Sequence, residues 1–140
     1  MSPDLHVVFN DDTNRLTVWD AAHTTAATCE ARNAATAGPG FGHNGRCPRG
    51  EFTLGMPVAK GTVPFGPWFI PVVGEERFGR DGIGIHGGGS GLARWDAPRQ
   101  GWAKTHGCIR VQNQDLETLV GLVKHALAAG GTVRFTVAGA

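Results

Sequence analysis

Residues that interrupt helices are spread along the whole of this chain. Of 140 residues, 22 are glycine and 8 are proline. This composition favours short strands joined by turns over long helices. The glycines follow no fixed period, which excludes a collagen-like chain and a repeat array. The length suits one domain with its own hydrophobic core, and we expect residues 1–140 to form it.

Alternating apolar residues predict strands in the first part of the chain. Residues 5–9 are typical of a strand, and a polar turn cluster follows at residues 10–14. Residues 15–19 alternate, with Leu16 and Val18 on one face. The two segments predict a hairpin, and residues 24–32, rich in threonine and alanine, predict a third strand.

The middle of the chain alternates between short strands and irregular segments. A long loop is expected over residues 33–48, followed by a short strand at 49–55. Prolines within residues 64–73 predict a strand with an edge or bulge position, because proline cannot donate to a ladder. Residues 82–86 predict a strand that ends at a histidine, and residues 87–104, rich in glycine and tryptophan, predict an irregular connector.

A single helix is predicted near the end of the chain. Asn113 is a suitable N-cap, and Gly130-Gly131 ends the helix. The apolar side chains form one helical stripe: Leu116, Leu119, Val120, Val123 and Leu127. A closing strand follows at residues 132–137, with Val133, Phe135 and Val137 facing inward. The expected fold is mainly β, with one C-terminal helix packed on the sheet.

Charge and hydropathy exclude several classes of partner. The net charge of +1 argues against a nucleic-acid partner and against a polybasic membrane anchor. No apolar run approaches the roughly 18 residues of a membrane helix. The first residues have no basic or apolar signal region, so we expect no Sec signal in this sequence. We also expect no membrane partner and a monomer.

The chemistry concentrates in two short motifs, IHG at residues 85–87 and THGCIR at residues 105–110. Cys108 becomes a strong nucleophile as a thiolate, and a nearby imidazole can take its proton. His106 lies close to Cys108 in sequence, but near neighbours often cannot align a ring nitrogen with the sulfur. His86 comes from another strand and can approach freely. Gly107 allows a tight turn whose N–H groups face an oxyanion, each worth about 3–4 kcal/mol in acyl transfer.

Two other interpretations of these residues stay open. His86, His106 and Cys108 could provide three zinc ligands and an open position. Cys29 and Cys47 could form a disulfide in an oxidising compartment, or be two unrelated small apolar residues. We expect no metal and no other cofactor.

The two motifs resemble the signature of L,D-transpeptidase catalytic domains of the YkuD type. CPRGEF at residues 47–52 resembles the T-P-x-G-x-F turn of that family, although Cys47 stands where threonine is common. The resemblance covers nearly the whole chain. It implies a YkuD-like β-sandwich of short strands with the helix packed on the sheet.

The resemblance also implies a role for each residue of the motifs. Cys108 is the nucleophile, and His86 is the general base, oriented by the backbone carbonyl of Gly87. His106 and Gly107 form the oxyanion-hole region with Cys108. The implied substrate-binding residues are Arg110, Thr105, Trp95 and Trp102. Arg110 positions the motif or a substrate carboxylate, and Thr105 occupies the family's Ser/Thr position. Trp95 and Trp102 belong to the connector, which forms a lid or acceptor wall.

The implied reaction is acyl transfer on peptidoglycan stem peptides in the periplasm or cell envelope. A Cys108 thioester forms as D-Ala leaves, and an amine of another stem or a D-amino acid resolves it. Resolution by water would make the enzyme an L,D-carboxypeptidase. A second hypothesis is a toxin-like effector that attacks a competitor's cell wall and has a cognate immunity protein. Such a protein would reach the envelope by a route other than Sec, or its signal would be missing from this sequence. A third is a non-catalytic or zinc-holding module that binds stem peptides.

Overall fold

The computed structural model describes residues 2–33, 46–80, 82–103, 105 and 107–139. Its regular elements are β1 (Leu5–Asn10), β2 (Arg15–Asp20), β3 (Thr25–Arg32), β4 (Gly50–Leu54), β5 (Val58–Thr62), β6 (Gly66–Val73), the 3-10 helix η2 (Glu75–Phe78), β7 (Gly84–His86), β8 (Ile109–Val111), α1 (Asn113–Ala128) and β9 (Val133–Ala138). The mainly β class with one C-terminal α-helix is confirmed.

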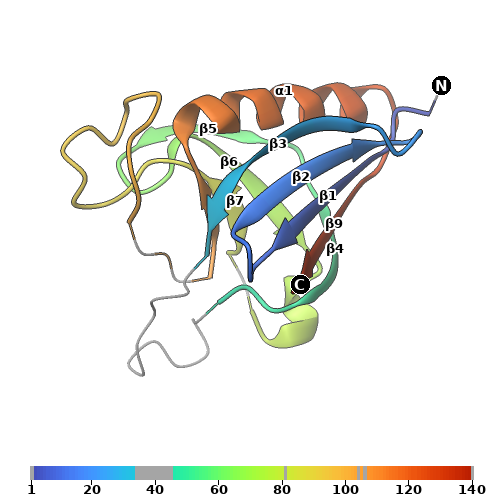
Figure 1. Ribbon diagram of the computed structural model, residues 1–140, viewed down its shortest axis with the longest axis horizontal. Helices are drawn as coiled ribbons and strands as arrows, with labels where there is room; N and C mark the ends of the chain where they lie inside the picture. Colours follow the sequence, from blue (N-terminus) through green and yellow to red (C-terminus); the bar gives the residue numbers. More distant parts are fainter. Residues whose placement is uncertain (1, 34–45, 81, 104, 106, 140) are drawn as a thin grey trace.

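The strands form one sheet in the order β4-β9-β1-β2-β3-β8-β7-β6-β5. An additional antiparallel pairing of β4 with β6 joins strands that stand far apart in this order and curls the sheet round on itself. The β1–β9 and β7–β8 pairs are parallel, and the other pairs are antiparallel. Helix α1 runs along one side of the sheet and contacts β6, β3 and β9 (Figure 1).

The core forms where the apolar alternation of the strands meets the apolar stripe of the helix. Leu16, Val18 and Phe135 are fully buried, as predicted. The helix contributes Leu116, Leu119, Val120 and Val123 to the buried core, and Leu127 packs against it from a partly buried position. Each fully buried large apolar side chain stabilises the fold by about 1.5–3 kcal/mol.

Two strands differ from the sequence-based expectation. β5, which was not predicted, is exposed at every residue, and its one partner strand among the described residues is β6, so no apolar alternation marks it. β7 begins at Gly84 rather than at Gly82. The predicted irregularity near the prolines is present, because the β5–β6 register shifts between Ala59 and Thr62, opposite Pro67. Most of the predicted loop at 33–48 lies outside the described residues.

The start of α1 is not capped in the predicted way. The N-cap position belongs to Gln112, and no side-chain cap bond forms there. The first N–H groups of the helix donate to the connector instead. The Asn113 N–H donates to Gln100 Oε1 (2.7 Å), and the Gln114 N–H donates to the Pro98 carbonyl oxygen (2.9 Å). This leaves the Asn113 side chain available for other contacts. The helix ends as predicted, with Gly130 in a left-handed conformation.

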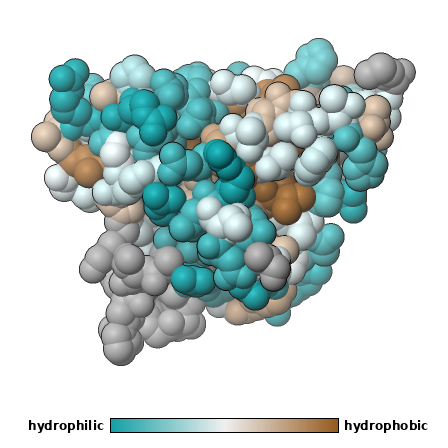
Figure 2. Space-filling model, in the orientation of Figure 1, coloured by the Kyte–Doolittle hydropathy of each residue, from teal (hydrophilic) through white to brown (hydrophobic). Residues whose placement is uncertain are grey.

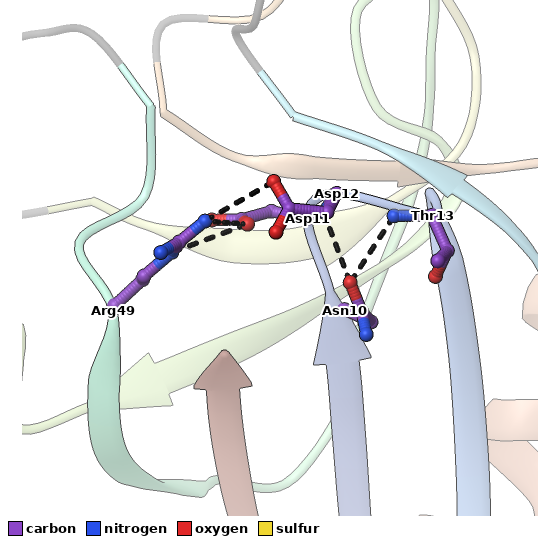
Figure 3. Close-up of polar contacts among 5 residues, drawn as sticks. All are labelled: Asn10, Asp11, Asp12, Thr13 and Arg49. Atoms are coloured by element: carbon purple, nitrogen blue, oxygen red, sulfur yellow. Dashed lines mark hydrogen bonds and ion pairs between the residues drawn. The ribbon is translucent and has the colours of Figure 1, made fainter. Parts of the chain in front are cut away.

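An ion pair fixes the β1–β2 turn to the strand that follows the undescribed segment (Figure 3). Arg49, just before β4, donates to both carboxylate oxygens of the buried Asp11 and to Asp12. Within the turn, the Asn10 side chain accepts from the N–H groups of Asp12 and Thr13. These contacts join the hairpin to β4.

Hydrophilic residues cover most of the face seen in Figure 2, and the hydrophobic residues there form small, separate patches. The large apolar side chains that are exposed in the described chain are Met56, Val58, Val63, Val73 and Phe78. No helix among the described residues is long and apolar enough to cross a membrane.

Candidate active site

Two short parallel strands bring the histidine and cysteine motifs together. β7 and β8 pair with Ile85 opposite Ile109 and His86 opposite Arg110. Both isoleucines are completely buried in the core. Because successive side chains alternate between the faces of a strand, His86 and Arg110 belong to the opposite face, together with Cys108, which lies one residue before β8.

The His86 imidazole is buried and held in one tautomer. Its Nδ1 lies 2.9 Å from the Gly87 carbonyl oxygen. Because a carbonyl only accepts, Nδ1 carries the hydrogen and Nε2 keeps a free lone pair. Phe65 packs edge-on to the ring at 5.0 Å between centroids, and Phe69 stacks on it at 6.0 Å. The ring is thereby fixed by packing as well as by hydrogen bonding.

Burial keeps the imidazole neutral. The pKa of His86 is lowered from 6.5 to about 4, mainly by desolvation; the Gly87 hydrogen bond opposes this shift, and the Arg110 charge adds to it. At neutral pH the ring is therefore a base with an open Nε2, and it is not an imidazolium that could stabilise a thiolate.

The half-buried Cys108 thiol keeps its proton at rest. Its Sγ donates to the Gly82 carbonyl oxygen at 3.5 Å, which requires the S–H form. Burial raises the pKa of Cys108 above its ordinary value, and the opposing effects of a Gly84 backbone hydrogen bond and of the Arg110 and Arg80 charges do not cancel it. No hydrogen bond joins His86 to Cys108, both of which are described residues.

The turn before β8 depends on glycine and threonine. Gly107 has φ of +117°, a conformation that residues with a side chain rarely adopt. The hydroxyl of the buried Thr105 donates to the Cys108 carbonyl oxygen at 2.6 Å. The predicted role of His106 falls outside the described residues.

Arg110 is buried beneath the site and binds backbone carbonyls. Its guanidinium donates to the carbonyl oxygens of Gly87 (3.2 Å), Ala103 and Pro64 (3.0 Å). A buried cation is tolerated when its donors are satisfied in this way. These bonds join the connector to the loop before β6.

The two predicted tryptophans have different surroundings in the structure. Trp95 is half-buried and lines a cavity of about 530 Å³ with Pro67, Pro98 and Glu117. Trp102 packs against the Arg32 guanidinium, 4.6 Å from the ring centroid. The aromatic rings that contact His86 within the described chain are those of phenylalanines, which the sequence alone did not single out.

The remaining cysteines do not form a bridge. Cys29 and Cys47 are both free thiols in the described structure, and burial raises the pKa of each to about 12. Of the three proposed zinc ligands, His86 and Cys108 lie within the described residues and His106 lies outside them. No group of three or more histidine, cysteine or acidic side chains at ligand spacing occurs among the residues that the structure describes.

The fold and the site define a mainly β protein with a histidine at the end of one strand and a cysteine just before the parallel neighbouring strand. The family model of the YkuD L,D-transpeptidase catalytic domain matches residues 4–134, and the chain belongs to this family. The family consists of cysteine-dependent L,D-transpeptidases, which supports a peptidoglycan-related acyl-transfer function. A sequence search of curated proteins finds no match.

Three solved structures share the fold. The helical cell shape determining protein Pgp2 from Campylobacter jejuni is 21% identical, with a TM-score of 0.68 over 96% of this chain and 47% of its own. Bd1075 of Bdellovibrio bacteriovorus is 14% identical, with a TM-score of 0.64 over 94% and 46%. L,D-transpeptidase 1 of Mycobacterium tuberculosis is 15% identical, with a TM-score of 0.51 over 96% and 61%. The chain spans about half the length of the first two structures.

Proposed function

We propose that this protein is a peptidoglycan L,D-transpeptidase in which Cys108 is the nucleophile and His86 the general base. The observation that carries the proposal is the His86 Nδ1–Gly87 carbonyl bond, which leaves Nε2 as a proton acceptor on the face that Cys108 shares. The family match supports peptidoglycan as the substrate and the cell envelope as the place of action. One core shared by the helix and by every strand except β5 supports a single catalytic domain over residues 1–140.

In the first step the Cys108 S–H turns from the Gly82 carbonyl toward Nε2 of His86. The thiol proton passes to Nε2 as Sγ attacks the carbonyl carbon between the third stem residue and the terminal D-Ala. Backbone N–H groups of the turn at Gly107 stabilise the oxyanion. The C–N bond then breaks, D-Ala leaves with the proton from Nε2, and a thioester remains on Cys108.

In the second step an acceptor amine attacks the thioester carbonyl. Nε2 of His86 takes a proton from the attacking nitrogen, the C–S bond breaks, and the proton returns to Cys108 Sγ. Water in place of the amine gives L,D-carboxypeptidase activity by the same path. A neutral imidazole beside a protonated thiol suits this order of steps, because His86 must accept a proton before it can donate one.

Thr105 and Arg110 hold the site in position in this proposal. Thr105 binds the Cys108 carbonyl and Arg110 binds the Gly87 carbonyl. Their polar groups therefore already have partners within the protein. These contacts support a positioning role for both residues over direct binding of a substrate carboxylate.

The test is incubation with purified tetrapeptide muropeptides, with and without a D-amino acid, followed by mass analysis of the products. The wild type is expected to release D-Ala, and to exchange it when a D-amino acid is present. Cys108→Ala and His86→Gln are expected to release none. D-Ala release by Cys108→Ala at the wild-type rate would contradict the proposal.

A further inference from the structure

The peptide unit between Gly87 and Gly88 is held from both sides. Its carbonyl oxygen accepts from His86 Nδ1 at 2.9 Å and from Arg110 Nε at 3.2 Å. Its N–H donates to Asn113 Oδ1 at 2.9 Å. Because carbonyl and N–H belong to one rigid plane, the bond on the N–H side helps to fix where the carbonyl points.

The close approach of Asn113 to this peptide depends on three glycines. A Cβ on Gly87 would lie 2.1 Å from Asn113 Oδ1, and one on Gly66 would lie 2.6 Å from the same atom. A Cβ on Gly88 would lie 2.4 Å from the Gly66 nitrogen. Non-bonded atoms do not approach this closely, so a side chain at Gly87 or Gly66 would block the Asn113 amide, and one at Gly88 would collide with the backbone at Gly66.

The orientation of the Asn113 amide follows from its partners. Its Nδ2 donates to the carbonyl oxygens of Trp95 (2.8 Å) and Ala97 (2.7 Å), and its Oδ1 accepts from Gly88. A flipped amide would turn its NH₂ group toward an N–H and its oxygen toward two carbonyls. The buried side chain is therefore locked with its oxygen toward the Gly87–Gly88 peptide.

We propose that Asn113 is a positioning residue for the catalytic imidazole. By holding the Gly88 N–H, Asn113 keeps the Gly87 carbonyl directed at His86 Nδ1, and so keeps the hydrogen on Nδ1 and the lone pair on Nε2. The consequence for catalysis rests on the proposed function, since only a reaction that uses Nε2 as base needs this tautomer. Without the Asn113 oxygen the peptide can rotate, and the imidazole can take the Nε2–H form, which cannot accept the thiol proton.

The test compares Asn113 variants by a spectroscopic and a kinetic measurement. Long-range ¹H–¹⁵N spectra report the tautomer of His86, assigned by the loss of its signals in His86→Gln. Asn113→Ala is expected to populate the Nε2–H tautomer and to lower kcat for D-Ala release by roughly 10²-fold, with little change in KM. In Asn113→Asp, burial against two carbonyls favours the protonated carboxyl, which keeps an oxygen toward Gly88 and an O–H toward one of the Trp95 and Ala97 carbonyls. This variant is expected to retain the wild-type tautomer and more of the kcat.

Gln112→Ala is the matched control. Gln112 is also buried and also binds the connector, through both the N–H and the carbonyl of Gly101, but it does not touch the Gly87–Gly88 peptide. It is expected to keep the wild-type tautomer. If Asn113→Ala does not fold, Asn113→Ser, whose hydroxyl is too short to reach Gly88 in the same way, replaces it.

The two measurements separate the two proposals. An unchanged Nδ1–H tautomer in a folded Asn113→Ala or Asn113→Ser protein would overturn the positioning role, whatever the activity. The same tautomer shift in Gln112→Ala would also overturn it, because the effect would then come from general loosening of the connector. A wild type without D-Ala release would overturn the proposed function, while the tautomer would still decide the role of Asn113.

Discussion

The protonation state of Cys108 can be tested by alkylation of the free enzyme with iodoacetamide across pH. Only the thiolate reacts, and about 1% of a thiol with the ordinary pKa of 9.0 is ionised at pH 7. Burial raises the pKa of Cys108, so its ionised fraction at pH 7 lies below this value. We expect the rate constant to rise about tenfold per pH unit from pH 7 to 9, because the thiolate fraction grows in that proportion.

A resting thiolate–imidazolium pair would behave differently. Its alkylation rate would be nearly constant from about pH 5 to 8, since the thiolate would already be formed. Mass mapping identifies the modified cysteine, and the pKa values of about 12 for Cys29 and Cys47 keep those two thiols slow. His86→Gln is expected to leave the profile almost unchanged. A plateau below pH 8 that disappears in His86→Gln would refute the neutral resting pair.

Three further predictions concern stability. The pKa of His86 falls from 6.5 in the unfolded chain to about 4 in the fold, so the unfolded state binds more protons between these two pH values. The free energy of unfolding, measured by urea titration, should therefore drop by about 3 kcal/mol from pH 7 to 4, and His86→Gln should remove this loss. Gly84→Ala places a Cβ 2.3 Å from the Phe69 ring and should lower the melting temperature, whereas Gly121→Ala, with open space around it on α1, should not. Arg49→Ala leaves a buried carboxylate without its ion pair and should lower stability while thiol alkylation of the folded protein stays unchanged.

Local patterns predicted most of the regular structure. The alternation at Leu16 and Val18 and the stripe from Leu116 to Val123 each reflect burial on one face, and those residues are buried. β5 was missed because all its residues are exposed on the outer side of β6. A strand of this kind leaves no apolar period in the sequence.

The site was predicted less completely, because its supports come from distant parts of the chain. The motifs pointed to His86, Gly87 and Cys108, and the Gly87 carbonyl does bind the imidazole. Phe69 contacts His86 only because β6 and β7 pair in that register. Nothing in the local sequence specifies such a register.

Asn113 shows the same limit. In the sequence its place at the start of a helix predicted a cap, since asparagine commonly fills that role. In the fold the connector supplies partners for the first N–H groups of α1, and the side chain turns to Gly88. The change of role depends on the return of the connector to the helix, which only the tertiary structure reveals.

The most direct test of the proposed function is the mass of the intact protein shortly after mixing with a tetrapeptide muropeptide. We predict an adduct equal to the muropeptide minus D-Ala, mapped to Cys108, discharged by an added D-amino acid and absent in Cys108→Ala. Release of D-Ala with no adduct on Cys108, and at an equal rate in Cys108→Ala, would contradict the account.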